Sequence, residues 1–206
     1  MKKAGLFLLF CSLITVSNAQ KSDFRFGLKA TPTLAWLKPD TKGVEADGAK
    51  LTFSWGFLAE YYFADNYAIA SGIDVVSRNG KYRINDTAQY DYKLKFIELP
   101  ITVKMRTNEI GYMRYFGQFG FTPGLNIRSK GDKTTPKLTL TDEDIKSEIN
   151  IFNLGLCVGL GIEYSLGGNT SLVVSANFNN GFTDITKTSD NKIISNYVAL
   201  NVGVLF

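Results

Sequence analysis

The chain has 206 residues, of which 45% are hydrophobic and 20% are charged, and its mean hydropathy is −0.03. Its net charge of +4 is spread too evenly to make a nucleic-acid-binding face, and the lack of histidine excludes Ser-His-Asp triads and most zinc sites. These averages fit a soluble protein, but they also fit a membrane barrel, in which lipid-facing and lumen-facing residues alternate. The order of the residues therefore decides the class.

The N-terminus has the pattern of a secretory signal peptide. Residues 1–3 are basic, and residues 6–16 form an apolar run that is too short to cross a bilayer as a helix. Small side chains at Ser17 and Ala19 fit the −3 and −1 positions of a cleavage site. We predict export, with cleavage between Ala19 and Gln20.

The rest of the chain is predicted to be one domain. We expect a signal peptide at residues 1–19 and one domain at residues 20–206, whose class the following patterns decide. The mature part would keep 21 Lys+Arg against 19 Asp+Glu, with Cys157 as its single cysteine. A lone cysteine forms no intramolecular disulfide, so an exported chain must gain stability elsewhere, for example from a closed, hydrogen-bonded barrel. Cys157 is expected to be a buried, inert thiol.

Apolar and polar residues alternate with a period of two in eight stretches, each long enough to cross an outer membrane as a tilted strand. The expected strands are 24–37, 51–63, 67–78, 90–106, 112–128, 151–165, 172–182 and 194–206. The fourth changes parity near Phe96 and Ile97, which predicts a β-bulge there, and Pro100 predicts a local break in pairing. The sequence thus predicts an all-β fold, an eight-stranded antiparallel transmembrane barrel of the size of OmpA or OmpX.

The expected connections alternate in length. Three are short, at 64–66, 107–111 and 166–170, whereas those at 38–50, 79–89, 129–150 and 184–192 are longer and polar. Short turns on one rim and long loops on the other are typical of outer-membrane barrels, with both termini on the periplasmic, short-turn side.

The alternative is a soluble, periplasmic, lipocalin-like barrel that binds a small ligand. Its strands also alternate between apolar and polar residues. It would bury the apolar face. The polar face is rich in glycine, which suits the crowded lumen of a narrow barrel, and aromatic residues gather near both ends of the strands, as at two membrane interfaces. Both features favour an apolar face turned toward lipid.

Eight charged residues are expected to point into the lumen, with four of each sign. They are Arg25, Lys29, Lys104, Arg114, Glu60, Asp74, Glu98 and Glu163. In so narrow a barrel they should form a paired plug rather than an aqueous channel, which excludes a general porin. Acid–base catalysis by Glu60 or Glu98 is the competing hypothesis, but no nucleophile is placed beside either. We therefore expect no enzyme, no catalytic residue, no metal and no cofactor.

The long connections are the expected contact surfaces. An extracellular or secretion-system partner would contact loops 38–50 and 129–150, and outer-membrane lipids would cover the barrel wall. Thr141 is expected to N-cap a short helix that ends at Ile149. The final strand ends at Phe206, which resembles the signal that the bacterial barrel-assembly machinery reads.

One segment resembles a known family. Residues 96–104, Phe-Ile-Glu-Leu-Pro-Ile-Thr-Val-Lys, resemble the Y-I-E-I-P-L-L-x-K segment of the PorT-like outer-membrane β-barrel proteins of Bacteroidetes. The segments 117–124 and 159–164 resemble that family's two following strands, and Phe96 and Thr102 are mild departures. The resemblance implies an integral outer-membrane barrel, and it supplies no catalytic residues. Our own hypothesis for the role is a structural, adhesive or secretion-accessory protein that acts through its outer loops.

Overall fold

The computed structural model describes residues 23–40, 43–84, 88–136, 138–187 and 192–206. The predicted signal peptide and its cleavage site at Ala19 and Gln20 lie outside these residues. Among the described residues, no helix is long and apolar enough to cross a membrane.

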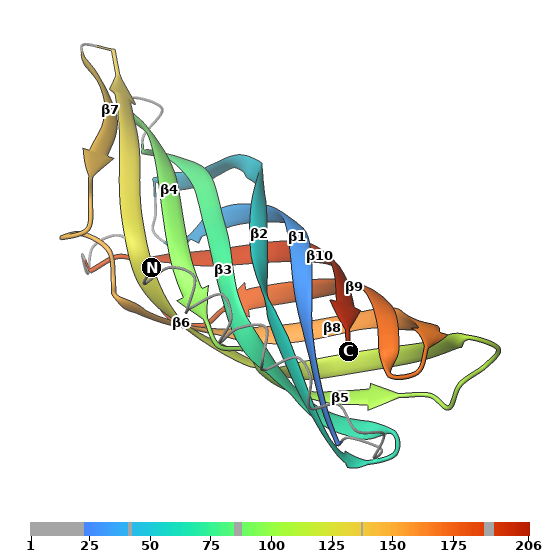
Figure 1. Cartoon of the computed structure of the whole chain (residues 1–206). Coiled ribbons are helices and arrows are strands. Elements are labelled where there is room, and N and C mark those ends of the chain that lie inside the picture. The colour runs from blue at the N-terminus through green and yellow to red at the C-terminus, as the bar shows by residue number, and fades with distance from the viewer. Residues whose placement is uncertain (1–22, 41–42, 85–87, 137, 188–191) are drawn as a thin grey trace, which may run out of the picture.

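The described chain forms one closed antiparallel ring (Figure 1). Its strands are β1 (Phe24–Pro39), β2 (Val44–Ala64), β3 (Tyr67–Ile84), β4 (Ala88–Glu98), β5 (Ile101–Arg106), β6 (Met113–Thr135), β7 (Leu138–Asp144), β8 (Phe152–Gly167), β9 (Thr170–Gly181) and β10 (Ile193–Leu205). Strands β4 and β5 occupy one position of the wall, because both lie between β3 and β6, and β7 pairs only with β6. β1 pairs with β10 and closes the ring. The predicted eight-stranded barrel is confirmed.

The predicted break at Pro100 is confirmed, since β4 ends at Glu98 and β5 begins at Ile101. The bulge predicted at Phe96 and Ile97 is wrong. Lys95 pairs with Arg128 and Phe96 pairs with Asn126, so the extra residue lies on β6, not on β4. Alternation along β4 is therefore unbroken. Its aromatic side chains Tyr92 and Phe96 face the lumen rather than lipid.

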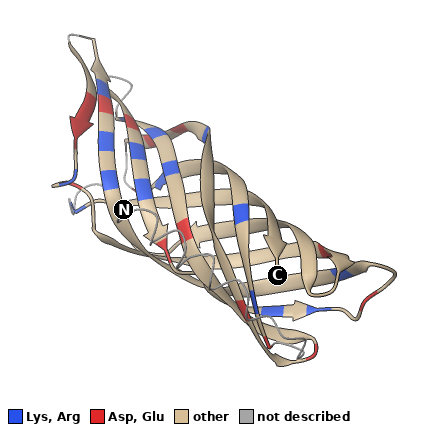
Figure 2. Ribbon diagram, viewed as in Figure 1, with Lys and Arg blue, Asp and Glu red and all other residues tan. Residues whose placement is uncertain are grey.

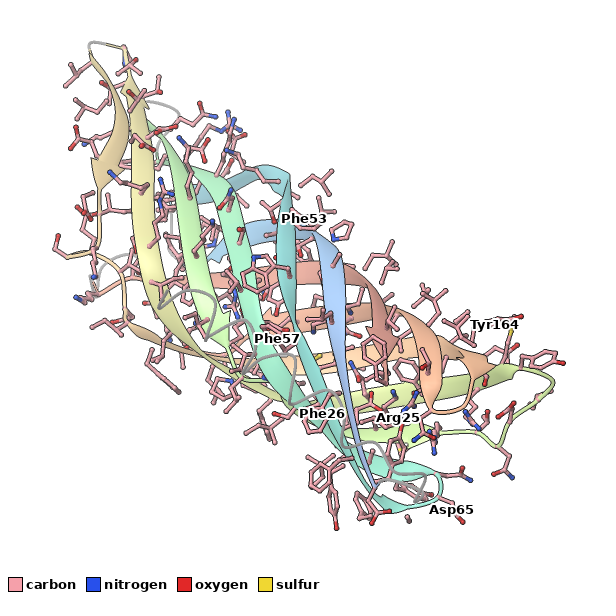
Figure 3. The ribbon with its side chains drawn as sticks, in the orientation of Figure 1. Arg25, Phe26, Phe53, Phe57, Asp65 and Tyr164 are labelled. Atoms are coloured by element: carbon pink, nitrogen blue, oxygen red, sulfur yellow. The ribbon has the colours of Figure 1, made fainter. Side chains whose placement is uncertain are left out.

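The apolar face of the wall points outward. Phe26, Phe53 and Phe57 are each more than half exposed and project from the barrel, whereas Arg25 projects inward (Figure 3). Glycine on the inner face allows close approach of strands: a Cβ on Gly120 would lie 2.1 Å from the carbonyl oxygen of Ile101. A lipocalin-like barrel requires the reverse arrangement, so that alternative is wrong.

The two rims of the barrel differ. At the short-turn rim, the Phe206 amide donates to the carbonyl of Phe26 at 2.7 Å, and the carbonyl of Asp23, where the described chain begins, accepts from the Tyr62 amide at 2.7 Å. At the other rim, five strands continue beyond the ring as a sheet that we call the wing (Figure 1). The wing consists of residues 44–49, 80–84, 88–94, 129–135 and 138–144.

The wing corrects two predictions about loops. Most of the expected loops 38–50 and 129–150 are extensions of strands. The helix expected from Thr141 is absent, because residues 138–144 form β7 and pair with β6 in a hairpin. Alternating Leu138 and Leu140 with threonines suits a strand better than a helix.

Candidate functional site

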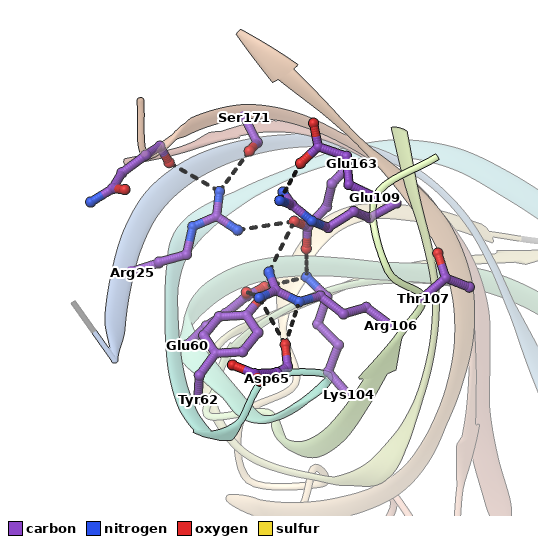
Figure 4. A network of polar contacts seen from close by, with 12 residues as sticks. Arg25, Glu60, Tyr62, Asp65, Lys104, Arg106, Thr107, Glu109, Glu163 and Ser171 are labelled. Atoms are coloured by element: carbon purple, nitrogen blue, oxygen red, sulfur yellow. Dashed lines mark hydrogen bonds and ion pairs between the residues drawn. The ribbon is translucent and has the colours of Figure 1, made fainter. Parts of the chain in front are cut away.

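The lumen near the short-turn rim contains a buried ion-pair network, which we call the charged layer: Arg25, Glu60, Lys104 and Glu163 (Figure 4). Arg25 Nη1 lies 2.9 Å from Glu163 Oε2, and Lys104 Nζ lies 2.6 Å from Glu60 Oε1. Lys104 also pairs with Glu163, so it bridges both carboxylates. The hydroxyl of Tyr62 donates to Glu60 at 2.7 Å. These contacts link β1, β2, β5 and β8 across the lumen.

Two further ion pairs lie deeper in the barrel. Lys29 Nζ lies 2.7 Å from Asp74 Oδ2. Glu98 accepts hydrogen bonds from Arg78 Nε at 2.8 Å and from the hydroxyl of Tyr197 at 2.7 Å. Arg78 is fully buried, with its guanidinium 4.8 Å from the ring centre of Phe96.

The structure thus brings together seven of the eight expected charges, and it separates Arg114 from them. Arg114 lies opposite Glu163 in the register, but it is the second residue of its strand, and its side chain pairs with Glu109 of the short turn at the rim. Two arginines were missed in the sequence. Arg78 takes part in the lumen, and Arg106 Nη1 lies 3.7 Å from Glu163. Arg78 shares the polar face of its strand with Asp74, which was the available signal.

The opposite mouth is filled by an apolar plug. Its buried members are Leu37, Val44, Tyr82, Tyr92, Leu94, Phe96, Ile149, Ile185 and Ile193. Two connecting segments close over it, because the amide of Asn150 donates to the carbonyl of Ile185 and that of Lys187 to the carbonyl of Glu148, each at 2.8 Å. The Asn150 side chain adds a bond to the Thr186 carbonyl at 2.8 Å.

Two small cavities lie between the charged layer and the plug. The two lumen cavities have volumes of about 60 and 40 Å³, and the larger is lined by Lys29, Asp74 and the buried Cys157. A basin of about 370 Å³ opens at the short-turn rim, beside Arg25 and Arg106. The two lumen cavities have room for a few waters. A further space of about 120 Å³ lies within the plug, beside Tyr82 and Tyr92.

The carboxylates of the lumen form ion pairs within the barrel. Glu60 and Glu98, the two considered for acid–base catalysis, are each buried and ion-paired. In the described part of the chain, no group of His, Cys, Asp or Glu side chains could hold a metal ion. The arrangement supports filling and bracing of the barrel.

The wing carries opposite charges across its strands (Figure 2). Lys93 Nζ lies 2.8 Å from Asp132 Oδ2, Arg83 lies 3.6 Å from Asp47, and Lys50 pairs with Asp91. The hydrogen bond from Lys93 holds the pKa of Asp132 below its usual value, and the same bond raises the pKa of Lys93. All seven side chains of β7 are exposed. The wing is thus an ordered, highly polar surface.

An outward apolar belt, a filled lumen and a closed ring define an integral β-barrel of the bacterial outer membrane. The chain belongs to the family of the outer membrane protein beta-barrel domain, whose sequence profile matches residues 18–187. No match was found among curated protein sequences.

Solved structures share this fold. Neisserial surface protein A, NspA, is similar with a TM-score of 0.51 and 16% identity, over 89% of this chain and 96% of that one. The outer membrane protein OprG from Pseudomonas aeruginosa is similar with a TM-score of 0.52 and 12% identity, over 91% of this chain and 97% of that one. At these identities the likeness concerns the fold.

Proposed function

We propose that this chain is a non-enzymatic outer-membrane barrel that displays its wing outside the cell, where the wing has a structural, adhesive or secretion-accessory role. The observation that carries the proposal is the contrast between a filled lumen and an ordered sheet that projects beyond it. A filled lumen gives no route for solutes, so the barrel is not a general porin. The exposed wing is the surface left for recognition.

The orientation in the membrane is part of the proposal. The short turns and both termini lie in the periplasm, and the wing lies outside, as is usual for outer-membrane barrels. Phe206 is proposed as the C-terminal signal for the barrel-assembly machinery, and cleavage between Ala19 and Gln20 as the export step. The motif at 96–104 supports a PorT-like subfamily of Bacteroidetes, and with it the secretion-accessory role.

Two variants, each with one added cysteine, test the orientation. Thr139→Cys lies in β7, and Asn108→Cys lies in an exposed turn at the other rim, while Cys157 is buried. A membrane-impermeant maleimide should label only Thr139→Cys on intact cells and both variants after lysis. Labelling of only Asn108→Cys on intact cells would reverse the orientation.

Removal of the wing tip tests the role. Residues 132–143 are replaced by a two-residue turn, and the barrel is checked by its faster migration in unheated than in boiled gel samples. Cells with the shortened barrel should lose either surface adhesion or part of their secreted proteins. Unchanged adhesion and secretion, at equal amounts of folded barrel, would contradict the proposal.

A further inference from the structure

Two cations lie side by side at the base of the wing, on the outer wall. Lys95 of β4 and Arg128 of β6 are direct partners in the register, and both are exposed. Opposed residues on antiparallel strands have Cβ atoms about 4.5–5.5 Å apart, and like charges at that separation destabilise the pairing. This arrangement costs stability unless an anion lies between the two cations.

The bulge on β6 produces this pairing. Ile127 and Arg128 are consecutive and both exposed, because the extra residue of the bulge lies between the pairs formed by Asn126 and Arg128. If β6 alternated regularly past Asn126, with no bulge, Arg128 would face the lumen, where the apolar plug lies. Bulges commonly re-aim a side chain in this way.

A second pair of opposed cations lies two residues farther into the wing along β4, and both of its cations have an acceptor. Lys93 and Lys130 are also direct partners. Lys93 is neutralised by Asp132, and Lys130 Nζ donates to the carbonyl oxygen of Asp142 at 2.8 Å. Within the part of the chain that the structure describes, the cations of Lys95 and Arg128 have no such acceptor.

The position of the pair indicates the kind of acceptor. Ile97 and Ile127, the neighbouring outward residues, are exposed and belong to the lipid-facing wall. The pair therefore lies where the apolar belt ends and the polar wing begins, at the level of lipid headgroups. A guanidinium binds phosphate with two parallel hydrogen bonds, and an ammonium adds a compact charge beside it.

We propose that Lys95 and Arg128 bind the phosphate of an anionic membrane lipid in the leaflet at the wing side of the barrel. Because that leaflet faces outward in the proposed orientation, the lipid is a phosphorylated glycolipid of the lipid A type. The choice of lipid rests on the proposed orientation, whereas the phosphate site rests on geometry alone.

Native mass spectrometry of the purified full barrel, in non-ionic detergent with diphosphorylated lipid A, tests the site. The double variant Lys95→Gln/Arg128→Gln should bind about tenfold less tightly, the loss of roughly one charge-assisted contact. Lys38→Gln is the matched control, since Lys38 is an exposed residue at the same end of β1, whose neighbours are β2 and β10 rather than β4 and β6.

Each variant is first shown to be folded by its gel migration before and after boiling. Equal binding by the double variant and the wild type would overturn the site, and so would an equal loss in Lys38→Gln, which would indicate general charge attraction. Inorganic phosphate at the same concentration should not displace the lipid, and displacement would overturn a lipid site. A reversed orientation in cells would leave these results unchanged, so the two proposals fail separately.

Discussion

The charged layer and the apolar plug fill the same narrow lumen with opposite chemistry. Near the short-turn rim, Lys104 pairs with Glu60 and Glu163, and all three side chains are buried. At the wing side, the plug is held by contacts among aliphatic and aromatic side chains. Removal of one ion leaves a buried charge without a partner, whereas removal of methyl groups leaves only a cavity. The two regions should therefore respond differently to substitution.

Loss of Lys104 should be the most damaging single change. Lys104→Met removes the cation shared by two buried carboxylates, and breaking a buried pair typically costs about 3–5 kcal/mol of the unfolding free energy. Urea unfolding in lipid vesicles measures the cost. Lys38→Met, the same change at an exposed lysine, should have little effect. A cost below about 1 kcal/mol for Lys104→Met would mean that water screens the charged layer.

Truncation of a plug side chain should lower the unfolding free energy by less than loss of Lys104, and its effect should be confined to the neighbouring segment. Ile149 is 1% exposed, so Ile149→Ala should lower the unfolding free energy by about 2–4 kcal/mol and speed protease cleavage between residues 145 and 151. Ile151→Ala is the control two residues away, because Ile151 is 58% exposed. Equal effects of the two substitutions would show that the segment does not anchor in the plug.

Arg114 tests the comparison further, because the sequence pattern predicts an inward-facing side chain for both Arg114 and Lys104. Its pair with Glu109 lies at the rim, with side chains 27% and 35% exposed. Arg114→Gln should therefore cost at most about 1 kcal/mol, as exposed pairs do. The same urea titration measures it, and a cost equal to that of Lys104→Met would place Arg114 in the charged layer after all.

Alternation in the sequence was sufficient to predict the ring, its eight wall positions and the side that faces lipid. It also predicted which strands carry the lumen charges. The prediction from alternation failed near the rims, where the inward or outward position of a residue no longer indicates which groups surround its side chain. Tyr92, Leu94 and Phe96 look lipid-facing in sequence, but they face the lumen and build the plug.

The plug could not be predicted from local patterns because it needs contacts between distant segments. Ile149, Ile185 and Ile193 come from connections and a strand end that show no period of their own. The shift of the bulge from β4 to β6 has the same origin, since a parity change between paired strands does not show which strand has the extra residue. Arg106 was missed because its contact with Glu163 comes from a side chain at the rim that reaches inward.

The wing should respond least to a single change, and only locally. Asp132 Oδ1 accepts a hydrogen bond from the amide of Asp142 at 2.8 Å, and its carboxylate pairs with Lys93, which together hold the β6–β7 hairpin. The pKa of Asp132 is lowered, chiefly by the hydrogen bond from Lys93. The folded hairpin therefore binds protons less readily than the unfolded chain, so this contribution is complete at neutral pH.

It is lost as the pH falls through the lowered pKa of Asp132. Hydrogen exchange of the β7 amides should accordingly be slow at neutral pH, relative to intrinsic rates, and should lose protection toward acid. Asp132→Asn should remove this pH dependence while leaving the amides of β8 and β9 protected. If protection in β7 falls with pH equally in both proteins, the hairpin is held by its backbone ladder rather than by the contacts of Asp132.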